Sequence, residues 1–299
     1  MSLRAWARAA RPLAHVNLAP PILLGQALAY AQTHTFDPVL AAVAFGFGAL
    51  DHLVIVFGND YADRDADAQA RARTLVSGGS RVIPDGLIRA SSLRAGALAA
   101  AIALLVGSAA AGAALDRPLL PAFALAALLL LHSYSFPPLR LSYRGFGEVV
   151  QGLGVGLVLP LLGWYAQTGE LARAPYDAFA PLVVLGFAAN ALTALPDLDG
   201  DRRAGKRTWP VRRGDGRARR DALALSGLGL VLATQVGPAL APAWIALSVG
   251  PPALCAVLSL GWLRPERPVL PFVVLTAGAG PLLALGWSAA LALGGASGP

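Results

Sequence analysis

Long apolar stretches recur along the whole chain and constrain its fold more than any other feature. A helix needs about 20 mainly apolar residues to cross the hydrocarbon core of a bilayer. The stretches that meet this requirement are 13–32, 37–58, 92–115, 118–135, 146–168, 176–196, 221–241, 242–263 and 269–293. They lack the apolar–polar alternation that marks a membrane β-strand. The sequence therefore predicts an all-α integral membrane bundle of nine transmembrane helices, with residues 1–299 forming a single domain.

The low content of charged residues supports this interpretation. Only 14% of the residues are charged, whereas a soluble domain carries about 25%. The single cysteine, Cys255, lies in an apolar run and has no partner for an internal disulfide. Lipid, rather than water, is therefore expected to solvate most of the surface.

Basic residues are divided unequally between the two sides of the predicted bundle. When the loops are assigned alternately, 22 of the 24 Lys and Arg residues fall on the N-terminal side, and only Arg117 and Arg173 fall on the other. Cytoplasmic loops carry such an excess. The pattern predicts a bacterial-type plasma (inner) membrane protein with a cytoplasmic N-terminus and a C-terminus on the opposite side. It also explains the net charge of +7 without a nucleic-acid partner, and a protein partner cannot be inferred from it.

The two longest loops, about 59–91 and 197–220, lie on the basic side, and the first begins with an acidic motif. Asn59, Asp63 and Asp67 follow one another at four-residue intervals, which places them on one face of a helix. Asp60 precedes Asp63 by three residues and is assigned to the same face.

His52, two turns before Asn59, extends this face into the membrane. Clustered carboxylates repel one another unless a cation compensates them, and oxygen ligands without imidazole or thiolate suit Mg²⁺. The alternative for this motif alone is a solvated acidic helix end that pairs with nearby arginines.

A second acidic motif follows the sixth predicted span. Asp197 and Asp201 are again four residues apart, and Asn190 lies two helical turns deeper on nearly the same face. Both motifs follow even-numbered spans on the same side of the membrane, so the sequence predicts that they meet across the bundle.

Basic residues accompany the two motifs. Lys206 and Arg207 follow the second motif, and Arg140 and Arg144 follow the fourth predicted span. Arginine forks and lysine ammonium groups bind phosphate oxygens. Carboxylates, a metal ion and basic residues together are what a diphosphate requires, because carboxylates alone would repel it. Each arginine has an alternative role as a marker of membrane topology.

These motifs resemble those of the UbiA superfamily of intramembrane prenyltransferases. The family carries NxxxDxxxD after its second span, which Asn59, Asp63 and Asp67 match, and DxxxD after its sixth, which Asp197 and Asp201 match. The resemblance covers nearly the whole chain and implies a nine-helix bundle with a central cavity.

Two further segments, 134–145 and 199–208, resemble the branch that contains 1,4-dihydroxy-2-naphthoate prenyltransferases. One position departs from that branch, because Pro196 stands where a basic residue often precedes the second motif.

The resemblance implies Mg²⁺-dependent transfer of a prenyl group from a prenyl diphosphate to an aromatic acceptor, a quinone precursor such as 1,4-dihydroxy-2-naphthoate. Two Mg²⁺ ions are expected to bridge the aspartates and the diphosphate, and the bilayer is expected to hold the prenyl tail. The implied residues are Asp63, Asp197, Lys206 and Arg144 for catalysis, Asn59, Asp60, Asp63, Asp67, Asp197 and Asp201 for the metal, Lys206, Arg207, Arg140 and Arg144 for the diphosphate, and Asn190, His52 and Tyr134 for the substrate pocket.

Other functions remain open at this point. Related family branches use homogentisate, 4-hydroxybenzoate or chlorophyllide-type acceptors. From a different class, a membrane transporter for a phosphorylated or cationic solute would also carry charged residues, although transporters place them near the bilayer midplane. A non-catalytic membrane scaffold does not explain the acidic spacing.

Overall fold

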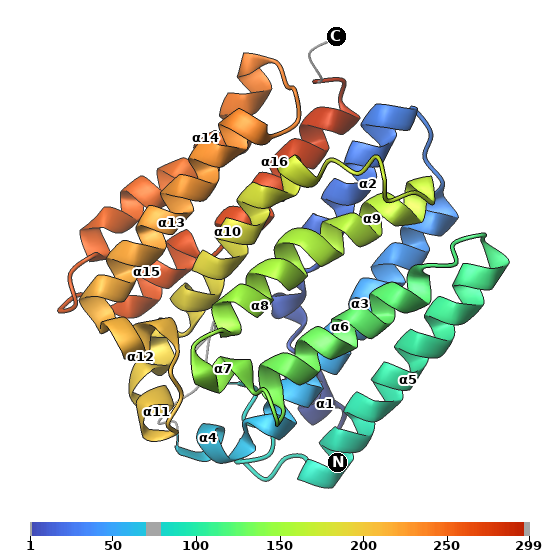
Figure 1. Ribbon diagram of the computed structural model, residues 1–299. Helices are drawn as coiled ribbons and strands as arrows, with labels where there is room; N and C mark the ends of the chain where they lie inside the picture. Colours follow the sequence, from blue (N-terminus) through green and yellow to red (C-terminus); the bar gives the residue numbers. More distant parts are fainter. Residues whose placement is uncertain (1, 70–78, 296–299) are drawn as a thin grey trace.

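Long helices lying side by side make up the protein, as the computed structural model shows for residues 2–69 and 79–295 (Figure 1). Within these residues there is no β-strand. In chain order the elements are α1 (Leu3–Ala10), η1 (Pro12–Asn17), α2 (Ala19–Thr33), α3 (Pro38–Ala62), α4 (Arg64–Gln69), α5 (Ala90–Ala114), α6 (Leu120–Ser135), α7 (Leu141–Arg144), α8 (Gly147–Leu153), η2 (Gly154–Val158), α9 (Leu159–Thr168), α10 (Tyr176–Thr193), η3 (Leu195–Asp197), α11 (Leu198–Arg203), α12 (Trp209–Arg213), α13 (Asp215–Val236), α14 (Pro242–Ser259), η4 (Leu260–Trp262), α15 (Val269–Thr276) and α16 (Ala279–Ala292).

Six helical segments are long and apolar enough to cross a membrane, counted over the described ranges. They are Pro38–Ala62, Ala90–Ala114, Gly147–Thr168, Tyr176–Arg203, Pro242–Trp262 and Val269–Ala292. The chain is therefore an all-helical integral membrane protein, as the sequence predicted.

Length and apolarity do not confirm the predicted count of nine spans. The helix α2 has 15 residues and α6 has 16. The helix α13 is longer, but its first turns are charged, and the buried guanidinium of Arg219 donates to Asp215 at 2.6 Å and to three backbone carbonyls between α14 and α15.

The N-terminal region differs from its predicted form. Residues 13–32 were expected to form one span, but Pro12–Asn17 form a separate 3₁₀ turn, and α1 precedes it. Arg11 adopts a left-handed conformation that ends α1, and Pro12 follows it. The helix α2 starts only at Ala19, where Pro20 and Pro21 occupy positions that need no intrahelical donor.

Short helices gather at one end of the bundle. The helices α1, α4, α7, α11 and α12 lie at this end, whereas α16 ends at the other (Figure 1). The predicted loops 59–91 and 197–220 are therefore partly helical. Residues 70–78, in the first loop, lie outside the described residues.

A proline lies directly before the second acidic motif and separates it from the membrane helix. The membrane helix α10 ends at Thr193, and Pro196 lies in the 3₁₀ turn η3 between it and α11. Because proline lacks an N–H and clashes with the preceding turn, the regular α-helix is interrupted there. Asp201 consequently lies on a short helix at the end of the bundle.

Candidate active site

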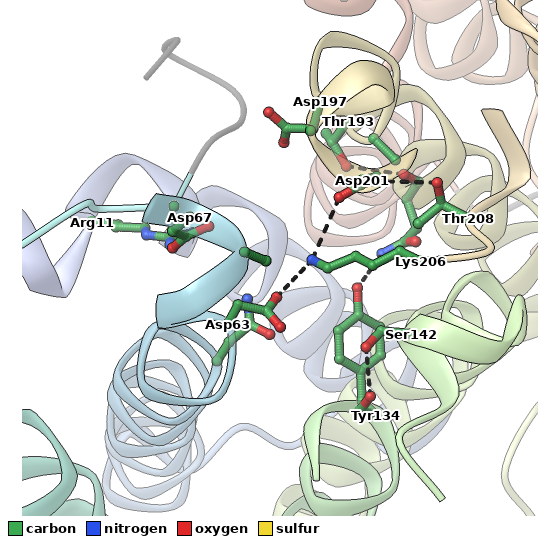
Figure 2. Close-up of a pocket in the computed structure, with 16 residues that line it drawn as sticks. Arg11, Asp63, Asp67, Tyr134, Ser142, Thr193, Asp197, Asp201, Lys206 and Thr208 are labelled. Atoms are coloured by element: carbon green, nitrogen blue, oxygen red, sulfur yellow. Dashed lines mark hydrogen bonds and ion pairs between the residues drawn. The ribbon is translucent and has the colours of Figure 1, made fainter. Parts of the chain in front are cut away.

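A polar pocket of about 180 Å³ lies among the short helices, and Figure 2 shows its lining. It contains residues from both acidic motifs, although they are far apart in the sequence. The acidic and amide side chains that line it are Asn59, Asp63, Asp67, Asn190, Asp197 and Asp201, and the basic ones are Arg11 and Lys206. The predicted meeting of the two motifs is therefore observed.

The first motif keeps its helical spacing through the junction of α3 and α4. The amide of Asp63 donates to the carbonyl of Asn59 at 2.8 Å, and the amide of Asp67 donates to the carbonyl of Asp63 at 2.8 Å. These i to i+4 bonds hold the three side chains on one face. The amide oxygen of Asn59 also accepts a hydrogen bond from Ser135 on α6 at 3.1 Å.

The second motif reaches the pocket through α11 and the turn before it. Asp197 and Asp201 both line the pocket. A carboxylate oxygen of Asp201 accepts from the Thr208 hydroxyl at 3.3 Å. Asp199 lies between them in sequence, but its side chain is 81% exposed and it is absent from the pocket lining.

Lys206 joins the two motifs. Its Nζ lies 2.9 Å from Oδ2 of Asp63 and 3.5 Å from Oδ1 of Asp201. Burial alone would lower the pKa of Lys206, but the charges of Asp63 and Asp201 raise it above its ordinary range. The ammonium group is therefore charged near neutral pH, and it occupies the place between the motifs that a shared cation would take.

Tyr143 completes this group on the side of Asp63. Its hydroxyl donates to Oδ1 of Asp63 at 3.0 Å, and Nζ of Lys206 lies 5.0 Å from its ring centroid. Burial and the charge of Asp63 raise the pKa of the phenol to about 12. Tyr143 therefore remains a hydrogen-bond donor and holds the Asp63 carboxylate in position.

Arg11 enters the pocket from the N-terminal segment, and the sequence analysis did not assign it to the site. Its guanidinium donates to the buried carboxylate of Asp60. It also lies beside Asp67 (Figure 2). Gly79, at φ +60°, allows this close approach, because a Cβ there would collide with Asp67 and lie 3.1 Å from Nη2 of Arg11. The only sequence feature that marks Arg11 is its position before Pro12, and its charge was explained by topology.

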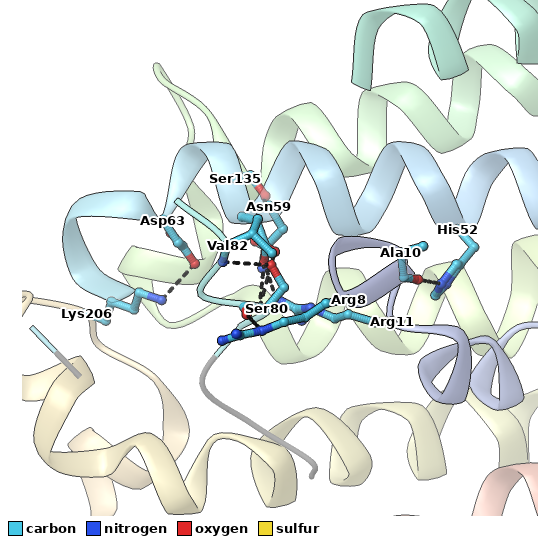
Figure 3. A network of polar contacts seen from close by, with 11 residues as sticks. Arg8, Ala10, Arg11, His52, Asn59, Asp63, Ser80, Val82, Ser135 and Lys206 are labelled. Atoms are coloured by element: carbon cyan, nitrogen blue, oxygen red, sulfur yellow. Dashed lines mark hydrogen bonds and ion pairs between the residues drawn. The ribbon is translucent and has the colours of Figure 1, made fainter. Parts of the chain in front are cut away.

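Five of the predicted site residues lie outside the pocket lining, and two of them, Asp60 and His52, contact the N-terminal segment instead. Asp60 was expected on the metal-binding face, but its carboxylate accepts from Arg11 and from the amide and hydroxyl of Ser80. One residue is about 100° of helix rotation, so Asp60 faces the N-terminal segment while Asn59 faces the pocket. His52 likewise contacts that segment, because its Nε2 lies 2.6 Å from the carbonyl oxygen of Ala10 (Figure 3).

The three predicted arginines also lie outside the lining. Arg144 is exposed and donates to the carbonyl of Pro138 at 2.8 Å, and Arg207 is exposed. The guanidinium carbon of Arg140 lies 3.5 Å from the ring centroid of Tyr143.

The other predicted pocket residues line the cavity. Asn190 donates to the Tyr134 hydroxyl at 3.3 Å, and both residues line the pocket. Their contact joins α6 to α10 on the membrane side of the acidic residues.

The donor chemistry of the pocket fits Mg²⁺. Its acidic and amide side chains offer oxygen ligands, and neither imidazole nor thiolate is among the lining residues. Burial, together with the charges of Asp60 and Asp63, raises the pKa of Asp67 to about 7, although Lys206 and Arg11 act in the opposite direction. In the parts of the chain that the structure describes, no three His, Cys, Asp or Glu side chains enclose a metal position. Lys206 stands between Asp63 and Asp201 instead.

Comparison with known proteins agrees with this geometry. Residues 18–272 match the UbiA prenyltransferase family. The chain is 28% identical over 228 residues to a 1,4-dihydroxy-2-naphthoate octaprenyltransferase of Escherichia coli (strain K12), which covers 73% of this chain and 71% of that protein.

Solved structures show the same fold. A UbiA homolog from Aeropyrum pernix K1, in its apo form, superimposes with a TM-score of 0.68 at 19% identity and covers 91% of this chain and 96% of its own. A UbiA homolog from Archaeoglobus fulgidus bound to DMAPP and Mg²⁺ has a TM-score of 0.62 at 18% identity and covers 95% and 97%. Because the family match spans most of the sequence, this chain is a member of the UbiA prenyltransferase family, a family of membrane-embedded transferases.

Proposed function

We propose that this protein transfers a prenyl group from a prenyl diphosphate to an aromatic acceptor in a Mg²⁺-dependent reaction, with 1,4-dihydroxy-2-naphthoate as the acceptor. The observation that carries the proposal is the contact of one ammonium group, that of Lys206, with both acidic motifs, at 2.9 Å and 3.5 Å. Two motifs this close can share cations with one diphosphate. The Archaeoglobus fulgidus homologs bound to DMAPP or GPP together with Mg²⁺ support the donor class.

The metal ligands in this proposal come from the two faces of the pocket. Asn59, Asp63 and Asp67 would hold Mg²⁺ on one face, and Asp197 and Asp201 on the other, with two ions in all. Bound Mg²⁺ supplies positive charge that stabilises the diphosphate as it leaves. We leave Asp60 out of this set, because Arg11 and Ser80 already occupy its carboxylate.

Lys206 has two successive roles in the proposal. Without substrate it neutralises Asp63 and Asp201. When diphosphate and metal enter, its ammonium group is free to turn toward phosphate oxygens, which it binds as a point charge. Arg11, which lines the same pocket, would add a second positive group on the side of Asp67. The proposal gives no role to three predicted arginines. Arg140 stacks on Tyr143, Arg144 donates to the Pro138 carbonyl, and Arg207 is exposed.

The acceptor is placed on the membrane side of the carboxylates. Tyr134 and Asn190 offer a hydroxyl and an amide there, joined at 3.3 Å, and these groups suit a hydroxylated aromatic ring. The naphthoate choice rests on the E. coli relative and on a Bacillus subtilis (strain 168) 1,4-dihydroxy-2-naphthoate octaprenyltransferase that is 27% identical over 78 residues. Excluding water from this region would protect the prenyl cation from hydrolysis.

The membrane arrangement is part of the proposal. We infer that α2, α6 and α13 cross the bilayer with the six longer segments, which gives nine spans in one domain over residues 1–299. The excess of arginine on the side of the pocket supports an inner membrane location, with the N-terminus and pocket cytoplasmic and the C-terminus outside.

A product assay tests the proposal directly. The purified full-length protein is incubated with Mg²⁺, a labelled prenyl diphosphate and one acceptor at a time, namely 1,4-dihydroxy-2-naphthoate, 4-hydroxybenzoate or homogentisate. Mass spectrometry should detect prenylated naphthoate, and pyrophosphate release should depend on the acceptor and stop when EDTA removes the metal.

The acidic motifs offer matched controls for this assay. Asp63→Asn and Asp197→Asn should reduce product formation by about 10²–10³-fold. Asp65→Asn and Asp199→Asn should leave it largely unchanged, because those side chains are 85% and 81% exposed. Turnover of 4-hydroxybenzoate alone would refute the naphthoate assignment. Undiminished turnover by Asp63→Asn would refute the metal site.

A further inference from the structure

A second cavity, of about 380 Å³, lies against α3 on the side away from the acidic pocket. The helices α5 and α6 lie side by side, and α3 contacts both (Figure 1). The volume falls in the range of about 300–1,000 Å³ that is usual for small-molecule sites. Its walls are mainly aliphatic and include Leu98, Ala101, Leu128, Leu129 and Leu131. We call this cavity the α5–α6 groove.

The groove lies in the half of the bundle that is nearer the acidic pocket. Its lining includes Gly58 and Tyr61 from the last turns of α3, Arg94 from the second turn of α5, and His132 near the end of α6. The same helix ends adjoin the acidic motif. In the membrane arrangement proposed above, the groove opens in the leaflet on the basic side of the protein, and its Arg94 end lies at headgroup depth.

The rim of the groove combines positive charge with aromatic rings. Guanidinium carbons of Arg64 and Arg94 lie 4.8 Å and 6.0 Å from the centroid of the Tyr61 ring. The ring of His132 stacks on Phe136 at 5.7 Å. Rings of this kind favour the interface between headgroups and acyl chains.

The charge of Arg94 is uncompensated by nearby acids. Among the described residues, no carboxylate lies within ion-pair distance of its guanidinium, which is exposed. Arg64 lies 3.8 Å from a carboxylate oxygen of Asp65 and also donates to the backbone carbonyl of Tyr61 at 2.7 Å. The groove therefore presents an aliphatic wall to bilayer chains and an available cation at one end.

We propose that the α5–α6 groove binds an anionic phospholipid, with one acyl chain along the leucines and the headgroup phosphate beside Arg94. Basic pockets between membrane helices on the cytoplasmic side suit anionic headgroups, and an arginine fork matches phosphate oxygens. Leu98 and Leu129 are 53% and 56% exposed, so a chain can enter sideways from the bilayer. A zwitterionic lipid would gain less, because its own ammonium group offsets the phosphate.

Competitive lipid binding tests the proposal. The delipidated full-length protein is offered equal amounts of phosphatidylglycerol and phosphatidylcholine with identical acyl chains, and bound lipid is counted by native mass spectrometry. The wild type should retain phosphatidylglycerol preferentially. Arg94→Gln should weaken phosphatidylglycerol binding about fivefold, the equivalent of about 1 kcal/mol per basic residue, and leave phosphatidylcholine unchanged. Arg94→Lys should keep most of the preference.

Two more variants separate the groove from general surface charge. Arg264→Gln removes an exposed basic residue between α14 and α15 and should bind lipid like the wild type. Ala101→Phe fills the groove and should reduce phosphatidylglycerol binding even though Arg94 is intact. The proposal is overturned if the wild type binds both lipids equally, or if Arg94→Gln behaves like Arg264→Gln. It is also overturned if geranylgeraniol, an isoprenoid alcohol, displaces the lipid from wild type and Arg94→Gln equally well.

Discussion

The two acidic motifs share a four-residue spacing but are supported in different ways. The first lies at the junction of α3 and α4, and its neighbour Asp60 is tied to Arg11 and Ser80 from distant parts of the chain. The second follows the break at Pro196, and Asp201 is held by Thr208 from its own loop. The first motif is thus supported by residues that are distant in the chain, whereas the second is supported by a residue of its own loop.

One residue connects these two halves of the site. Lys206 belongs to the loop after the second motif, yet its shortest ion pair is with Asp63 of the first. The second motif therefore supplies the cation that compensates the first. Variants of the first motif, of its anchor Asp60 and of Lys206 should therefore have distinct effects.

The largest effect is expected from Asp63→Asn. This change removes a carboxylate charge that contacts both Lys206 and Tyr143. Loss of one group that stabilises charge in the transition state costs about 10²–10³ in kcat, so the rate of pyrophosphate release should fall by about that factor. Asp65→Asn should keep more than half of the wild-type rate. Similar losses in both variants would mean that general acidity, not position, matters.

Asp60→Asn should act on stability more than on chemistry. The change leaves Arg11 without its buried partner, and breaking a buried ion pair costs about 3–5 kcal/mol, less where one partner is partly exposed as Arg11 is. Thermal unfolding in detergent should show a clearly lower Tm. The double variant Arg11→Met/Asp60→Asn should recover part of that loss. Additive losses in the double variant would contradict the coupling between the N-terminal segment and α3.

Lys206→Met should lower both activity and diphosphate affinity. The variant leaves Asp63 and Asp201 facing each other without their shared ammonium group. Loss of a charge-assisted contact of about 1.5–3 kcal/mol corresponds to a decrease in kcat/KM of roughly 10- to 150-fold. Arg207→Gln, at the next position, should change kcat/KM less than threefold because that side chain is exposed. Equal decreases in kcat/KM at both positions would contradict the proposed role of Lys206 as the cation shared by the two motifs.

Tyr143→Phe should have the smallest effect of the series. It deletes one hydrogen bond of 3.0 Å to Asp63 and leaves the charges in place. A hydrogen bond of about 1 kcal/mol predicts a roughly fivefold decrease in kcat. Steady-state kinetics at saturating Mg²⁺ would measure it. A decrease as large as that of Asp63→Asn would show that Tyr143 contacts substrate.

The sequence predicted the acidic pocket better than its basic partners. Asn59, Asp63 and Asp67 were correctly placed on one face, because i to i+4 spacing is a property of the helix itself. Asp60 was assigned to the same face and instead turns toward Arg11. The partner of Asp60 depends on which other segments pack against this side of α3, and helical periodicity contains no information about that packing.

Basic side chains are long and numerous on this side of the membrane, which made them hard to rank. The predictions named Lys206, Arg140, Arg144 and Arg207, and of these only Lys206 lines the pocket, together with Arg11, which was not predicted. The side chain of Lys206 reaches Asp63 because α11 and α4 pack against each other, a tertiary contact that the sequence does not show. Nothing in the spacing of Arg11 pointed to a residue 49 positions away.

The sequence by itself determined an all-helical membrane protein and the two carboxylate motifs, because hydropathy and helical period act over short stretches of chain. Only the tertiary structure decided which basic side chain faces each carboxylate, which helix ends lie together, and where the α5–α6 groove forms beside α3. These features depend on contacts between residues that are distant in the chain, and packing, rather than local preference, selects them.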